Sequence, residues 1–193
     1  MSPIYTYLHY YPGKAWTTIL ILGMVSYVSY RILKAAYSRG RIEKLQAKAA
    51  LLLIAYSLIL IYLTFLGRRP MDSYGTNFNL GYSYRKAFWE GNVEIRKEIM
   101  ENILLFLPIG GLGVMARKRF RFPVTMTYGI LLSAAVEYFQ LHLHRGLCEY
   151  DDILSNTMGT LIGSLLALTI IGIRCNQKER HAVVNGKKSD ILH

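Results

Sequence analysis

Long apolar runs separated by short polar stretches divide the chain. A transmembrane helix needs roughly 17–25 apolar residues to cross a hydrocarbon core of about 30 Å. Four runs meet this length easily, and a fifth, residues 99–115, only just reaches it. The fifth run contains Pro108, which removes one helix hydrogen bond, so it either spans fully or forms a broken helix. The pattern predicts an all-α, polytopic membrane helix bundle of about five transmembrane helices. The expected spans are residues 16–33, 47–66, 99–115, 124–141 and 153–173.

Charge is distributed unevenly between the polar stretches. With five spans and the N-terminus outside, the cytoplasmic side carries a net charge of +12 and the outer side −1, which together give the +11 of the chain. This asymmetry agrees with the positive-inside rule and predicts an N-out, C-in topology. If residues 99–115 did not span, the basic tail would lie outside. We therefore expect a transmembrane domain over residues 1–173, with an outer loop at 67–98, followed by a flexible basic cytoplasmic tail at 174–193.

Composition supports the membrane interpretation and excludes other classes. Apolar residues make up 52% of the chain and charged residues 18%, whereas soluble domains have about 25% charged residues. Two cysteines are too few for a disulfide framework. Because the basic residues follow the expected topology, their excess indicates contact with anionic membrane lipids and not with nucleic acid.

Polar side chains gather at the outer ends of three expected spans. The polar side chains in residues 124–141 share one helix face. An ionisable group inside a membrane costs several kcal/mol unless it is paired, so such groups are functional candidates. Two structural explanations remain open: hydrogen bonds that hold helices together, and capping of the last helix by its acidic residues. The residues are Glu101, Asn102, Ser133, Glu137, Gln140, Arg145, Asp151, Asp152 and Asn156.

The chemistry open to this group is limited. Glu137 suits general acid–base work and Arg145 suits binding of an anionic group. Asp151 and Asp152 could hold a divalent cation, but two carboxylates are a weak signal, so we expect no cofactor and no metal site. The His142–Cys148 segment does not have a recognised zinc spacing and is interpreted as an interfacial loop.

Two sequence blocks resemble the VanZ-like family of bacterial membrane proteins. The first, ENILLFLPIG at residues 101–110, is similar to the family segment N-[IL]-L-x-F-x-P-x-G. The second resembles the family pattern S-x-x-x-E-x-x-Q … R … D-D-x-x-x-N-x-x-G-x-x-x-G. It consists of Ser133, Glu137, Gln140, Arg145, Asp151, Asp152, Asn156, Gly159 and Gly163. Independently of the resemblance, the spacing of the two glycines predicts close helix packing.

The resemblance implies a multi-pass protein of the bacterial cell membrane, associated with low-level resistance to teicoplanin. Teicoplanin is a lipoglycopeptide that acts outside the cell on lipid-linked cell-wall precursors. One hypothesis is a non-enzymatic site in the outer leaflet that binds a lipid headgroup, a precursor or the antibiotic. In it Arg145 holds an anionic group, while Gln140, Asn156 and Glu137 line the polar floor.

The alternative hypothesis is an intramembrane hydrolase or head-group transferase that acts on a lipid-linked substrate. In this enzyme Glu137 is the acid–base group, Arg145 binds the anion, and Asp151 or Asp152 is a base or metal ligand. Transport of a small lipid fits less well, because the polar groups do not continue to the inner leaflet.

Overall fold

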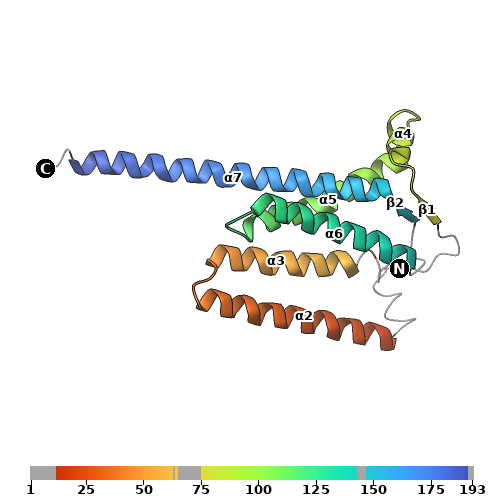
Figure 1. The fold of residues 1–193 in the computed structure, drawn as a ribbon, viewed down its shortest axis with the longest axis horizontal. Coiled ribbons are helices and arrows are strands. Elements are labelled where there is room, and N and C mark those ends of the chain that lie inside the picture. Colours follow the sequence, from red (N-terminus) through yellow and green to blue (C-terminus); the bar gives the residue numbers. More distant parts are fainter. Residues whose placement is uncertain (1–11, 63, 65–74, 143–146, 191–193) are drawn as a thin grey trace.

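The computed structural model describes residues 12–62, 64, 75–142 and 147–190. Within these residues the chain forms six helices and one pair of short strands (Figure 1). The all-α prediction is confirmed, because the strands have only three residues each. In chain order the elements are α2 (Pro12–Ser38), α3 (Lys44–Ile61), β1 (Gly75–Asn77), α4 (Tyr82–Phe88), α5 (Val93–Met115), α6 (Arg121–His142), β2 (Leu147–Glu149) and α7 (Tyr150–Asp190).

A long helix covers four of the five predicted spans completely, and α3 covers residues 47–61 of the predicted span 47–66. Within the described residues, three segments are long and apolar enough to cross a membrane: Lys44–Ile61, Val93–Met115 and Tyr150–Gln177. The exact number of spans and their orientation remain predictions. Residues 63, 65 and 66 of the second expected span lie outside the described residues.

Helix α5 passes through Pro108 without a break, so the full-span alternative agrees with the structure. The helix begins at Val93, where the Asn92 side chain caps it by accepting the N–H of Ile95 at 3.1 Å. The charged stretch before residue 99 is therefore the first part of this helix. The resulting 23 residues correspond to about 34 Å of helix, enough to cross a bilayer.

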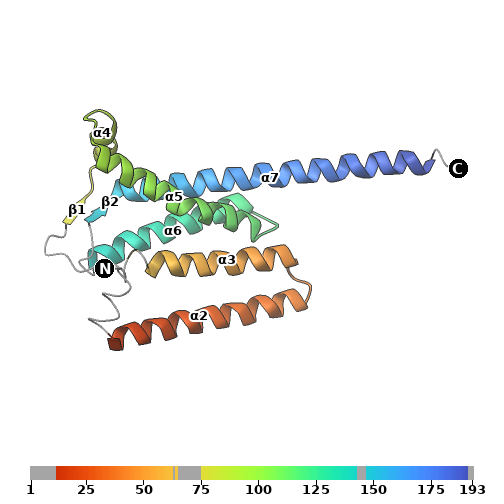
Figure 2. The same cartoon turned by 180° about the vertical axis from the view of Figure 1, so that it is seen from behind.

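Helices α5 and α7 cross in close contact (Figure 2). A Cβ atom on Gly159 would overlap the carbonyl oxygen of Ile103, and one on Gly163 would overlap that of Leu107. In the other direction, a Cβ atom on Gly110 of α5 would overlap the carbonyl oxygen of Thr160 on α7. Small residues therefore allow the two backbones to approach, as the glycine spacing predicts.

Helix α7 extends far beyond the other helices toward the C-terminus, as both ribbon views show. It continues through residues 174–190, which we expected to form a separate flexible tail. This stretch contains no proline and only one glycine, so its sequence does not stop the helix. The helix therefore does not end at residue 173, where the predicted transmembrane span ends.

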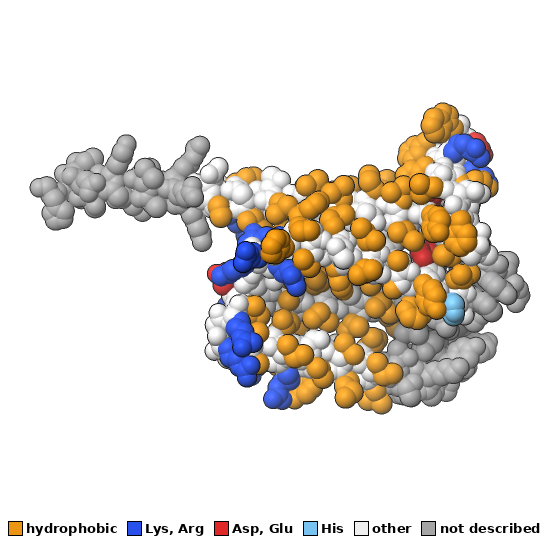
Figure 3. All heavy atoms as spheres, viewed as in Figure 1, with side chains coloured by type: hydrophobic (Ala, Val, Ile, Leu, Met, Phe, Trp, Pro, Cys, Tyr) orange, Lys and Arg blue, Asp and Glu red, His pale blue; other side chains and the backbone are white. Residues whose placement is uncertain are grey.

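Apolar side chains cover much of the bundle surface, and charge is concentrated at its ends (Figure 3). Lys and Arg gather at the end formed by the α2–α3 and α5–α6 turns. We call this the basic end, and the opposite end, where α7 begins, the polar end. The buried apolar core between them is small and consists of Leu60, Phe106, Ile109 and Val136. This distribution is typical of a protein whose outer surface faces lipid.

Candidate functional site

A hydrogen bond between α6 and α7 forms the base of the polar end. Asn156 Nδ2 donates to Ser133 Oγ at 2.9 Å, and the two residues are 3% and 0% exposed. The helices run in opposite directions (Figure 1), so one turn further toward the polar end leads to Glu137 on α6 and to Asp152 on α7. The two carboxylates therefore lie at about the same level of the bundle.

Glu137 is buried beneath strand β2. The residue is only 3% exposed, and its Oε2 accepts the backbone N–H of Glu149 at 3.1 Å. Gln140, less than one turn further along α6, is 5% exposed. The inward face of α6 that the spacing predicts is therefore present, and strand β2 covers its end.

Asp152 connects α7 to the third helix of the cluster. Asn102 Nδ2 on α5 donates to Asp152 Oδ1 at 2.8 Å, and both side chains are half-buried. Together with the contacts of Glu137 and Asn156, this bond shows that the predicted polar residues of α5, α6 and α7 meet at one end of the bundle.

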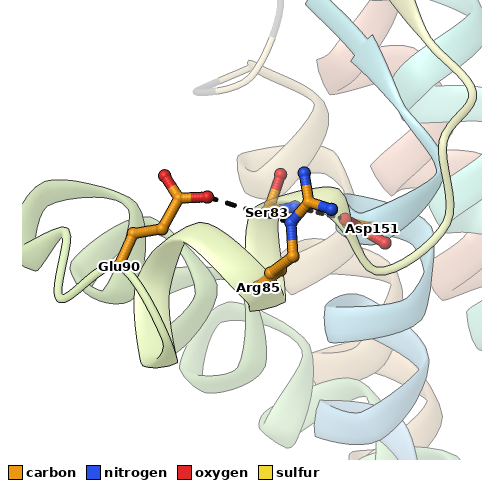
Figure 4. A network of polar contacts seen from close by, with 4 residues as sticks. All are labelled: Ser83, Arg85, Glu90 and Asp151. Atoms are coloured by element: carbon orange, nitrogen blue, oxygen red, sulfur yellow. Dashed lines mark hydrogen bonds and ion pairs between the residues drawn. The ribbon is translucent and has the colours of Figure 1, made fainter.

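Asp151 has a different environment. Its two carboxylate oxygens accept the backbone N–H groups of Gly81 and Ser83 at 2.6 and 2.7 Å, and the residue is 2% exposed. Figure 4 shows Asp151 beside Ser83. Gly81 has a φ of +82°, a conformation that favours glycine and allows its N–H to reach the carboxylate. A carboxylate here stabilises the positive N-terminal end of α4. Asp151 thus caps α4, whereas the sequence interpretation considered only the helix that carries it.

Further side chains hold α4 over the polar end. Ser83 Oγ donates to Glu149 Oε2 at 3.0 Å, and the Tyr84 hydroxyl lies 2.8 Å from Ser155 Oγ. Sequence reasoning missed these four residues. The seven-residue helix lies in a stretch rich in loop-forming residues, so no periodic signal indicated that it would pack on α7.

Cys148 lies near three acidic side chains of the polar end. It is 8% exposed and occupies β2, which pairs in parallel with β1 through the Thr76–Cys148 register. Burial of the thiol and, after it, the negative charges of Glu137, Asp152 and Glu149 raise the pKa of Cys148 above its ordinary value. The thiol is therefore largely protonated at neutral pH, which makes it a poor nucleophile.

One acceptor in this cluster has no partner. Asn156 Oδ1 is buried and makes no hydrogen bond to any described residue. A buried acceptor without a donor costs about 1–3 kcal/mol. The described polar end is therefore rich in hydrogen-bond acceptors. Glu137, Asp152 and Glu149 accept the hydrogen bonds given above, whereas the amide oxygen of Asn156 has no partner there.

Two predicted residues are not part of this described network. Glu101 lies on the exposed face of α5, where its side chain is 63% exposed and 3.6 Å from Lys97 Nζ. Arg145 lies outside the described residues. No group of three His, Cys, Asp or Glu residues in the described part of the chain could hold a metal ion.

Comparison with protein families identifies one match. The family model described as VanZ/LLP1 matches residues 51–171, which is more than half of the chain and includes every described residue of the polar cluster on α5, α6 and α7. The comparisons with curated proteins and with solved structures give no match.

Proposed function

We propose that this chain, which belongs to the VanZ/LLP1 family, binds the polar part of a lipid-linked molecule at its polar end without chemically changing it. The family is associated with teicoplanin resistance, and the chain is a membrane protein by its apolar helices and its family. In this proposal the protein crosses the bacterial cell membrane several times, with the polar end outward and the basic end in the cytoplasm. The ligand is a lipid headgroup, a lipid-linked cell-wall precursor or the antibiotic.

The unpartnered Asn156 Oδ1 is the observation that carries the proposal. An amide oxygen buried beside Ser133 gains most from a ligand that donates a hydrogen bond. Glu137 and Asp152 lie one turn closer to the polar end and add acceptors. Sugar hydroxyls, amides and amines are donors of the required kind. The site is therefore suited to the glycan and peptide parts of the lipid-linked molecules named above.

The local chemistry favours binding over catalysis. An enzyme would need a free base or a reactive nucleophile near the substrate. Both oxygens of Asp151 already accept backbone N–H groups, and the raised pKa of Cys148 keeps its thiol protonated. Glu137 and Asp152 are then the remaining candidates for acid–base work in the alternative, an intramembrane hydrolase or transferase.

A susceptibility test separates the two. A susceptible Gram-positive host would express the wild type, Glu137→Gln or Asn156→Leu, and growth would be measured with teicoplanin and with vancomycin. Glu137→Gln keeps the shape and one acceptor, so a binding site loses only part of its protection, whereas an enzyme that needs the proton loses all of it. Asn156→Leu removes the unpartnered acceptor and should abolish protection.

The matched control is Glu94→Gln, the same chemical change on an exposed residue in the first turn of α5. Membrane expression of every variant would be measured in parallel. Complete loss with Glu137→Gln alone would support the enzyme. Full protection by both cluster variants would overturn the proposal, and so would a wild type that gives no protection.

A further inference from the structure

A large groove lies at the other end of the molecule. It has a volume of about 810 Å³ and is bordered by the start of α3, the second half of α5 and the middle of α7. Its walls are apolar and include Leu107, Leu112, Leu166 and Ile170. This volume is within the usual range for sites that bind small molecules, about 300–1,000 Å³.

The rim of the groove is strongly basic. Arg117, Lys118 and Arg121 come from the α5–α6 turn and the start of α6, and Arg174 comes from α7. Among the described residues that line the groove, Glu43 is the one acidic residue, and its carboxylate lies 2.7 Å from Lys118 Nζ. The rim therefore keeps a positive excess even after this ion pair forms.

Arg121 adds an independent indication of a missing anion. Its Nε is buried and makes no hydrogen bond within the described part of the chain. A buried guanidinium N–H without an acceptor costs free energy, and phosphate oxygens are among the acceptors that arginine binds best. The residue that carries this unmatched donor lines the groove.

We propose that this groove binds one anionic phospholipid, with its phosphate group at the basic rim and an acyl chain along the apolar wall. A free phosphate would leave the wall without a partner, and a zwitterionic lipid would match the charge of the rim less well. Basic pockets between transmembrane helices bind anionic headgroups by this combination of contacts. The site lies at the opposite end from the acceptor-rich cluster and does not depend on the function proposed for that cluster.

Native mass spectrometry of the purified full-length chain in a non-ionic detergent tests the proposal. The probes are phosphatidylglycerol, phosphatidylcholine with the same acyl chains, and inorganic phosphate. We expect phosphatidylglycerol to bind at least about tenfold more tightly than phosphatidylcholine, because several cations contribute to headgroup binding. Inorganic phosphate should not displace it.

Three variants locate the bound lipid. Arg117→Gln and Arg174→Gln change exposed side chains, so the fold is not at risk, and each should weaken phosphatidylglycerol binding about fivefold. The control Arg119→Gln removes the same charge from the same turn but outside the groove, and should change binding less than twofold. Leu166→Trp fills the groove from a half-exposed position and should weaken binding of both lipids.

Several results would overturn the proposal. Equal binding of the two lipids would remove the role of charge, and an Arg119→Gln effect as large as that of Arg117→Gln would indicate a diffuse attraction. Displacement by inorganic phosphate would indicate a simple anion site. Unchanged binding in Leu166→Trp would place the lipid elsewhere. Dimers that disappear in Leu166→Trp would assign the groove to a second copy of the chain.

Discussion

The two ends of the bundle carry charge in opposite ways. At the polar end, polar groups are buried and held by hydrogen bonds, as the Asp151 carboxylate and the side-chain N–H of Asn156 illustrate. At the basic end, Arg117 and Arg174 are exposed around an apolar groove. Buried polar groups need fixed partners, so the first arrangement defines a precise geometry. Exposed cations keep their freedom and attract mobile anions, so the second gives charge selectivity with little structural specificity.

The close contact of α5 and α7 joins the two ends, and its disruption should have the largest effect. In the double variant Gly159→Ala and Gly163→Ala, each new Cβ atom overlaps a backbone carbonyl that cannot move independently. We expect a loss of about 4 kcal/mol in the free energy of unfolding, at 1–3 kcal/mol for each overpacked position. Thermal unfolding followed by circular dichroism in detergent would measure it.

Gly172→Ala is the control for this change. It lies on the same helix, and an added Cβ atom there would meet nothing within 4 Å. Alanine at this position should leave stability equal or slightly higher, because it has the better helix propensity. A double variant as stable as Gly172→Ala would show that α5 and α7 do not need their close approach, and that the two ends are not coupled through it.

Asp151→Ala tests whether fixed partners organise the polar end. The change leaves the backbone N–H groups of Gly81, just before α4, and of Ser83, in its first turn, without an acceptor, at about 1–3 kcal/mol each. We expect α4 to detach while the long helices persist. Hydrogen–deuterium exchange should show loss of protection at Gly81 and Ser83 but not in α3. Unchanged protection in α4 would contradict the assignment of Asp151 as its cap.

These examples also show what could be predicted from the sequence. The five long helices follow from apolar runs of membrane length, and the close packing of α7 follows from its glycine spacing, although that spacing does not identify α5 as the partner. The inward positions of Glu137 and Asn156 follow from helical periodicity. The residues at which the helices begin and end were less predictable, because α5 and α7 extend into charged segments that also favour helix.

The partners of the polar residues could not be predicted in the same way. Periodicity shows which face of a helix a residue occupies, but it does not identify the loop that packs on that face. The capping of α4 by Asp151 links positions about 70 residues apart, and the approach of Glu149 to Glu137 depends on a three-residue strand. Neither contact has a local sequence signal.

The two cysteines report on the two ends separately. Cys148 is buried at the polar end, whereas Cys175 is exposed beside the groove. Because burial and neighbouring carboxylates raise the pKa of Cys148, less of its thiol is ionised at a given pH. We expect maleimide to modify Cys148 at least about tenfold more slowly than Cys175 at pH 7.5, since the thiolate is the nucleophile.

The pH dependence sharpens this prediction. The Cys148 rate should keep rising at a pH above the ordinary thiol pKa. In Glu149→Gln the loss of one negative charge should lower that pKa and shift the rate profile to lower pH. Labelling followed by peptide mass spectrometry assigns each rate to its cysteine. A Cys148 profile that Glu149→Gln does not shift would show that charge at the polar end does not act on this thiol.

The smallest effect on stability is expected at the basic end. Glu43→Gln removes the ion pair with Lys118, but both side chains are more than 60% exposed, and such pairs contribute about 0–1 kcal/mol. The glutamine oxygen can still accept the hydrogen bond that Glu43 makes in the capping box of α3. Thermal unfolding should therefore change little, in contrast to Asp151→Ala.

Glu43→Gln also frees Lys118 at the groove rim, so phosphatidylglycerol should bind about threefold more tightly in the native mass spectrometry assay. This gain is within the roughly fivefold that one cation contributes. A large loss of stability without a gain in binding would mean that the basic end, like the polar end, depends on fixed pairs, and the contrast between the two ends would fail.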